Sequence, residues 1–209
     1  MRRIAVCVTT CIGLALMAGT AVGEENGITL DAHQKDLVDK VSSYFSAIHT
    51  LQGSFLQTSS DNQRMKGKFY VQRPGRFRFD YARPSRQIVI SDGQHLAVED
   101  LDLNTEDRVE LDQTPFRLLL SSDVDLIRDA QIMEVQQSDD LIMIALQAKD
   151  PNAGGQIKLY LATKPELQLK AWVTKDAEGI DTRVEISNRD KTADLDSDFF
   201  KIAPLGSKE

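Results

Sequence analysis

Three histidines are the side chains in this sequence best suited to acid–base catalysis or to zinc binding. His33 and His49 lie at the two ends of one predicted helix, and His95 follows an Asp-Gly pair in a predicted strand. None has a second histidine or a cysteine at the spacing of a zinc site. The sequence also lacks the Gly-x-Ser-x-Gly and His-Glu-x-x-His motifs and a glycine-rich phosphate loop. We therefore expect no catalytic residue, no metal and no cofactor, with a secreted hydrolase built from distant residues as one alternative.

The carboxylates gather in one place, where Glu99, Asp100, Asp102, Glu106 and Asp107 occur within nine positions. Their spacing is not that of a calcium-binding loop, which favours a solvated turn. The whole chain carries 25 basic and 32 acidic side chains, a net charge of −7. Such a chain does not attract nucleic acid or anionic surfaces, so we expect no nucleic-acid partner.

The first 23 residues have the pattern of a secretory signal peptide. Arg2 and Arg3 precede an apolar stretch over 4–17, and small residues at Ala21 and Gly23 mark a cleavage site. The apolar stretch is too short to span a membrane with these flanks. We expect residues 1–23 to be removed and residues 24–209 to form one soluble, exported domain.

Both cysteines of the chain, Cys7 and Cys11, lie in this predicted leader. The exported domain is therefore expected to have no disulfide bond and no lipid-modified cysteine at its N-terminus. Loss of Arg2 and Arg3 leaves 23 basic against 32 acidic residues, which makes the net charge −9.

The hydrophobic pattern predicts one long helix followed by many strands. Over 31–49 the apolar residues form a single helical stripe, and the remaining positions are mostly polar. Pro115 after Thr114 favours a second, short helix over 115–120. Elsewhere the period is two and short turns separate the apolar stretches. The expected strands are 53–59, 65–73, 76–81, 87–91, 94–100, 108–112, 131–137, 141–148, 155–162, 167–175 and 179–188.

About eleven antiparallel strands in one sheet curl, and a barrel of that strand number is wider than its own side chains readily fill. The fold class expected is therefore mainly β with helices, a curled antiparallel sheet whose concave face is covered by the two helices. This pattern leaves two interpretations open, a packed core or a lipid-binding cavity under a movable lid. The expected lining is Phe55, Phe69, Val71, Phe77, Phe79, Tyr81, Ile88, Ile90 and Leu96, and the expected lid residues are Leu37, Val41, Phe45, Ile48, Phe116, Leu119 and Leu120.

Four ordered segments carry a resemblance to a known family, the LolA family of periplasmic outer-membrane lipoprotein carriers. They are 53–57 (GSFLQ), 71–81 (VQRPGRFRFDY), 88–93 (IVISDG) and 113–120 (QTPFRLLL). Membership implies a periplasmic, monomeric protein with an eleven-stranded unclosed barrel and a hydrophobic cavity for the acyl chains of lipoproteins. It also implies two partners, an inner-membrane ABC transporter that releases the lipoprotein and an outer-membrane acceptor that receives it.

The resemblance assigns one residue a special role, because the family's arginine before the proline reaches the lid and corresponds here to Arg73. A guanidinium has five donors in a fixed fork and stays charged, so it suits the free carbonyls at helix ends. Two departures imply an altered cavity shape: Phe79 stands where the family often has tryptophan, and Ala97-Val98 replace aromatic residues. A periplasmic lipid-binding sensor or regulator on the same half-barrel is the second alternative.

Overall fold

The computed structural model describes residues 27–149, 155–176, 178–191 and 194–203. The predicted signal peptide, with Cys7 and Cys11, lies outside these residues. Among the described residues, no helix is both long enough and apolar enough to cross a membrane.

The elements are α1 (Ala32–Ser46), β1 (Thr50–Thr58), β2 (Arg64–Gln72), β3 (Arg76–Tyr81), β4 (Gln87–Asp92), β5 (His95–Asp100), β6 (Thr105–Glu110), η1 (Leu111–Gln113), α2 (Arg117–Leu120), α3 (Leu126–Asp129), β7 (Ala130–Ser138), β8 (Leu141–Ala148), β9 (Gln156–Ala162), β10 (Gln168–Lys175), β11 (Asp181–Asp190) and η2 (Ser197–Phe200).

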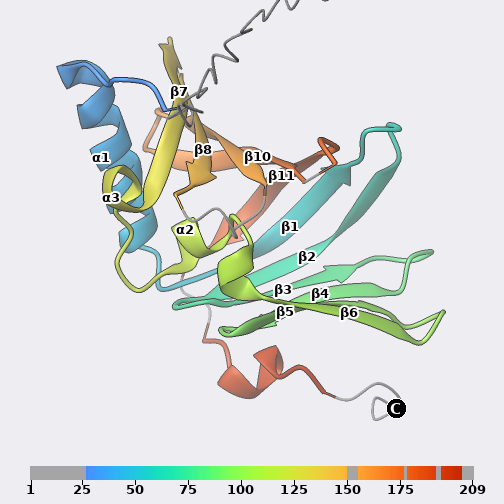
Figure 1. Cartoon of the computed structure of the whole chain (residues 1–209). Helices are drawn as coiled ribbons and strands as arrows, with labels where there is room; N and C mark the ends of the chain where they lie inside the picture. The colour runs from blue at the N-terminus through green and yellow to red at the C-terminus, as the bar shows by residue number, and fades with distance from the viewer. Residues whose placement is uncertain (1–26, 150–154, 177, 192–193, 204–209) are drawn as a thin grey trace, which may run out of the picture.

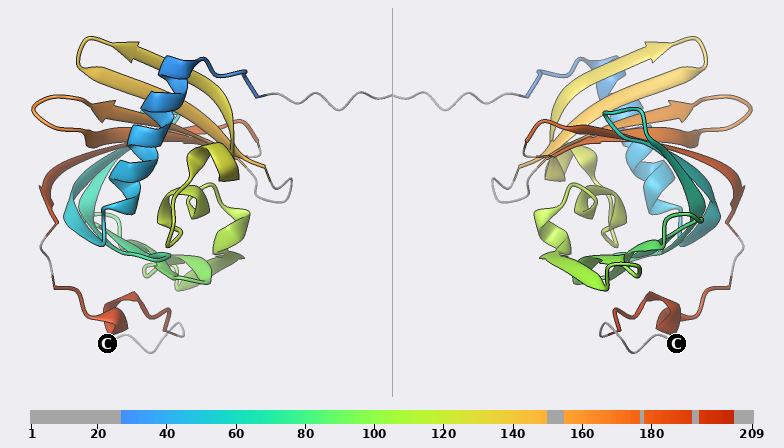
Figure 2. Two further views of the ribbon diagram at one scale, coloured as in Figure 1. Left: turned by 90° about the vertical axis from the view of Figure 1, so that its left-hand side faces the viewer. Right: turned by 90° about the vertical axis from the view of Figure 1, so that its right-hand side faces the viewer.

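All eleven strands belong to one antiparallel sheet in the order β6-β5-β4-β3-β2-β1-β11-β10-β9-β8-β7. The first and last halves of the chain thus meet at one long-range pair, β1 with β11. The strands β6 and β7 are the two edges, so the sheet is not closed. Seen end-on, the sheet is a curved wall, with α2 and α3 inside its hollow and α1 across it (Figures 1 and 2). The expected half-barrel is confirmed.

Helix α1 begins at a capping box. The Asp31 side chain accepts from the backbone amide of Gln34, and the Gln34 side chain accepts from the backbone amide of Asp31. Its buried stripe includes Leu37, Val41 and Phe45, which join the main core. The helix ends three residues before the predicted boundary of 49. The amide of Ile48 bonds to the carbonyl of Phe45, a tight last turn that leads the chain into β1. Ile48 is still buried, but it lies beyond the helix.

The central part of the chain differs most from the expected boundaries. The residues predicted to end the sixth strand, Leu111 and Asp112, belong to the 3-10 turn η1, and the strand itself begins at Thr105. The helix predicted over 115–120 is shorter, four residues of α2. The short helix α3 had no prediction, although the Asp125 side chain caps it by accepting from the Arg128 amide.

The register of β2 to β5 decides which side chains face the hollow. Phe69 pairs with Phe79, Phe79 with Val89, and Val89 with Val98, so these residues share the concave face. Since alternate residues of a strand face opposite ways, Ile88 and Ile90 point to the outer face. The prediction that these two isoleucines line the cavity is wrong.

A C-terminal segment covers this outer face and explains why the isoleucines are apolar. Phe200 of η2 is 1% exposed, and Ile202 packs on the cluster that contains Ile88 and Ile90. The ring of Phe199 lies under the guanidinium of Arg78, whose carbon is 4.6 Å from the ring centroid. In Figure 1 this segment runs along the side of β3–β6 opposite to α2. The sheet is therefore buried on both faces in this region.

Candidate functional site

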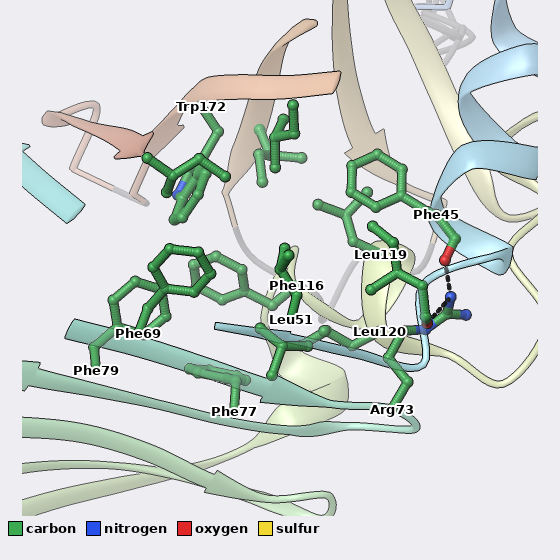
Figure 3. A pocket seen from close by; sticks show the side chains of 15 residues that line it. Phe45, Leu51, Phe69, Arg73, Phe77, Phe79, Phe116, Leu119, Leu120 and Trp172 are labelled. Atoms are coloured by element: carbon green, nitrogen blue, oxygen red, sulfur yellow. Dashed lines mark hydrogen bonds between the residues drawn. The ribbon is translucent and has the colours of Figure 1, made fainter. Parts of the chain in front are cut away.

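A cavity lies between the concave face of the sheet and the helices (Figure 3). Its lining is apolar except for one arginine, which lies at the end nearest α1. The aromatic rings come from α1, β2, β3 and β10 and from the loop before α2, so both halves of the half-barrel contribute. The lining residues are Phe45, Ile48, Leu51, Phe69, Val71, Arg73, Phe77, Phe79, Phe116, Leu119, Leu120, Ile157, Leu169, Trp172 and Ile186.

Phe79 is at the centre of the aromatic lining. Its ring stacks on Phe69 with centroids 5.9 Å apart and meets Trp172 edge-on at 6.0 Å. Phe77 contacts Phe116, which reaches down from the lid, at 5.6 Å. These contacts lie in the range of favourable aromatic pairs. The rings thus join the two walls of the hollow and the lid in one packed cluster.

The free volume of this cavity is about 80 Å³. That is space for only a few groups of water size. A long acyl chain does not fit into this space. The structure is therefore a closed state, and a ligand of that size requires the lid to move away from the sheet.

Arg73 bonds to the C-terminal ends of both α1 and α2. The guanidinium donates to the carbonyls of Phe45 and Ser121 and, at 3.2 Å, to that of Ile48. Phe45 is in the last turn of α1, and Ser121 is the C-cap of α2. Carbonyls at helix C-termini lack intrahelical partners and carry partial negative charge, which suits a cation. One side chain from the sheet therefore binds both helices.

This arrangement has an electrostatic cost. Burial lowers the pKa of Arg73 from its ordinary value, and the charge of Asp123 opposes that change only in part. Its Nε atom is buried and has no hydrogen-bond partner among the described residues. Arginine nevertheless stays charged, since its ordinary pKa is far above neutral pH. The cation is thus held in a partly desolvated position, at the α1 end of an apolar cavity.

Backbone and hydroxyl bonds tie the lid together. The amide of Gly75 donates to the carbonyl of Leu120 at 2.8 Å, just past Arg73 on the same turn. Ser42 and Ser46 of α1 bond to the backbone of Leu126 and Val124. Helix α1 is therefore joined by hydrogen bonds to the segment that carries α2 and α3. We call α1 together with residues 115–129 the lid.

The structure places the predicted lining residues in three groups. Phe69, Val71, Phe77 and Phe79 line the cavity. Three more, Phe55, Tyr81 and Leu96, lie on the concave face outside the cavity. Leu96 packs with Phe77 and Leu111, and Phe55 packs against Tyr81 and Phe79. Ile88 and Ile90 are on the outer face, as described above.

The predicted lid residues divide in a similar way. Phe45, Ile48, Phe116, Leu119 and Leu120 line the cavity. Leu37 and Val41 belong to the core that α1 forms with the sheet. Five lining residues had no place in the prediction of the cavity, and four of them come from the second half of the chain. They are Leu51, Ile157, Leu169, Trp172 and Ile186.

The side chains suited to catalysis remain apart. Within the described ranges, no group of three His, Cys, Asp or Glu residues is placed to hold a metal ion. His33 bonds to Gln137 on the surface, and His95 lies between Asp92 at 3.6 Å and Glu110 at 3.4 Å. The candidate site is therefore the apolar cavity together with Arg73, the cation that bonds to both helices at its edge.

Comparison with known proteins identifies the family of this chain. The family model described as "Outer membrane lipoprotein carrier protein LolA" matches residues 46–203. The outer-membrane lipoprotein carrier protein of Methylococcus capsulatus is 30% identical over 174 residues, which cover 79% of this chain and 82% of that protein. The carrier protein of Chromobacterium violaceum is 26% identical over 193 residues, which cover 88% of this chain and 91% of that protein.

Among solved structures, a DUF1329 family protein from Desulfovibrio piger has a TM-score of 0.51 at 10% identity, covering 83% of this chain and 98% of that one. At that identity the likeness concerns the fold alone. The family match spans most of the chain, from the end of α1 to the C-terminal segment on the outer face. The chain therefore belongs to the LolA family of outer-membrane lipoprotein carrier proteins.

Proposed function

We propose that this protein is a periplasmic carrier, and not an enzyme, that shields the acyl chains of lipoproteins in the cavity under the lid. The observation that carries the proposal is an apolar cavity whose one polar lining residue, Arg73, binds the lid. The relatives named above as outer-membrane lipoprotein carriers support it.

The chemistry of the cavity suits a saturated chain. Transfer of a methylene group from water into an apolar site is favourable by about 0.8 kcal/mol, and it needs no hydrogen-bond partner. The phenylalanine and aliphatic side chains that form most of the lining offer none. A polar ligand of the same size would lose its hydrogen bonds to water without compensation. The cavity therefore selects for aliphatic chains.

Export and the two handover partners complete the proposal. Residues 1–23 act as a cleaved signal peptide, and residues 24–209 are the carrier domain. A monomer receives the lipoprotein from an inner-membrane ABC transporter and passes it to an outer-membrane acceptor. The family resemblance supports both partners, and the acidic composition agrees with the absence of nucleic acid.

Arg73 acts in this cycle as a latch, which we define as its three bonds to the carbonyls of Phe45, Ile48 and Ser121. In the empty protein the latch keeps the lid on the sheet. Entering acyl chains displace Phe116 and Leu119 and break the latch. Closure after release restores the bonds, so the latch favours unloading.

The proposal is tested by native mass spectrometry of the protein purified from periplasm, with and without a co-expressed lipoprotein. We expect a one-to-one complex that disappears when the acylated cysteine of the lipoprotein is replaced. Leu120→Glu, which places a charge in the cavity, should abolish the complex. Leu103→Glu is the matched control, because Leu103 is 73% exposed on the β5–β6 turn. The absence of a complex with the unmodified carrier would refute the proposal.

A further inference from the structure

The lid covers only part of the concave face. It lies over the ends of β3 to β6 that carry Phe77 and Leu96, and the opposite ends of these strands extend beyond it (Figure 1). In this uncovered part Val98 is 37% exposed, although it faces the hollow. Val89 is half-buried. The closed state therefore leaves apolar side chains of the inner face in water.

These valines continue the cavity. Phe79 lines the cavity and pairs with Val89, which pairs with Val98 on the next strand. Side chains at paired positions lie about 5 Å apart, so the three form an unbroken apolar row across β3, β4 and β5. The row ends at Asp107 of β6, the partner of Val98. We call Val89 and Val98 the valine row.

Aromatic side chains of β3 lie next to the valine row. Phe79 pairs with Val89, and Tyr81 follows two residues later on the same face of β3. On the side away from the lid, Tyr81 donates to the Gln57 side chain at 2.5 Å, which closes that end of the hollow with a polar pair. An apolar ligand that extends beyond the cavity along β4 and β5 thus meets the two valines.

We propose that the valine row is a second binding segment for the cargo, on which the part of an acyl chain that extends beyond the lid lies. This inference rests on the proposed carrier function. The row offers no donor or acceptor, so it fits an aliphatic chain and not a peptide strand, whose backbone groups need partners. From Phe79 on β3 to Val98 on β5 the apolar surface spans two strand spacings, about 10 Å, which adds a second binding segment to the cavity under the lid.

Photo-crosslinking locates the chain directly. The photoreactive residue p-benzoylphenylalanine is placed singly at Val98, at Leu119 in the cavity, and at Arg108 on the outer face of β6. Each purified protein is irradiated with a synthetic triacylated lipopeptide. We expect adducts at 98 and 119 and none at 108. An adduct at 119 without one at 98 overturns the valine row and leaves the carrier intact. No adduct at either site counts against both proposals.

Affinity provides the second measurement. Val98→Asp should raise the Kd for the triacylated lipopeptide at least tenfold, because it puts a charge on the row. Val98→Ile keeps the site apolar and should leave the Kd within twofold. Val98 is already exposed, so both variants should melt like the unmodified protein. An unchanged Kd for Val98→Asp, with lipopeptide still bound by the unmodified protein, refutes the valine row alone.

Discussion

Replacement of Arg73 by leucine removes the latch and leaves a shorter, apolar side chain. Three hydrogen bonds are lost, to the carbonyls of Phe45, Ile48 and Ser121. A hydrogen bond with a charged donor contributes about 1.5–3 kcal/mol when well buried. Arg73 is half-buried, and burial already lowers its pKa, so desolvation offsets much of this gain. We take about 2 kcal/mol for the whole latch.

That free energy fixes the expected effect on cargo. About 2 kcal/mol is roughly a 30-fold change in an equilibrium constant. If the lid opens that much more easily, cargo should bind up to 30-fold more tightly to Arg73→Leu, because less binding energy is spent on opening. Handover to the acceptor should slow by a similar factor. The empty variant should also be less stable than the unmodified protein.

Trp172 allows a direct assay. It is the single tryptophan of the chain and it lines the cavity, so its fluorescence reports on a bound lipopeptide. The Kd and the rate of handover to a purified acceptor are measured for both proteins. Arg76→Leu is the matched control, with the same change of charge on the outer face of β3. A Kd and a handover rate within twofold of the unmodified protein for Arg73→Leu would refute the latch.

Three further predictions concern the framework around the cavity. Phe200→Ala should lower the free energy of unfolding by about 3 kcal/mol in urea titrations without changing lipopeptide affinity, since Phe200 is buried on the outer face; a changed affinity would contradict this separation. Gly67→Ala should destabilise by about 3 kcal/mol, because a Cβ there meets the Asp80 carbonyl at 2.1 Å and the Phe55 ring at 2.5 Å; an unchanged unfolding midpoint would contradict it. Burial raises the pKa of Tyr81 to about 12, so the unfolded state loses this proton first and stability should fall by about 1.4 kcal/mol per pH unit between about pH 10 and 12. Tyr81→Phe should lose less stability over that range, and equal losses in both proteins would refute the assignment.

The sequence predicted the concave face well where apolar and polar residues alternate. In Arg76–Tyr81 the pattern places Phe77 and Phe79 on one face, and the structure agrees. It failed at Ile88-Val89-Ile90, where three apolar residues in a row give no alternation. Such a run occurs when both faces of a strand are buried. The partner of the outer face is Ile202, more than a hundred residues away, so no local signal identifies which face is which.

The second half of the cavity wall was missed for a related reason. Ile157 and Leu169 alternate with polar residues, which predicts strands. Which of their faces lines the hollow depends on the pairing of β1 with β11, where Phe55 lies opposite Ile186. That pairing joins distant parts of the chain and sets the register of the whole second half. Local periodicity gives the strands, and only long-range pairing gives the cavity.

The latch and the cavity together limit how transfer is driven. A latch of about 2 kcal/mol offsets the burial of only two or three methylene groups at about 0.8 kcal/mol each. An acyl chain buries more than that in the cavity and on the valine row. Closure of the lid therefore does not release the cargo by itself, and the greater part of the driving force must come from the binding site of the acceptor. On this reasoning Arg73 adjusts how readily the carrier unloads, while the acceptor determines the direction of transfer.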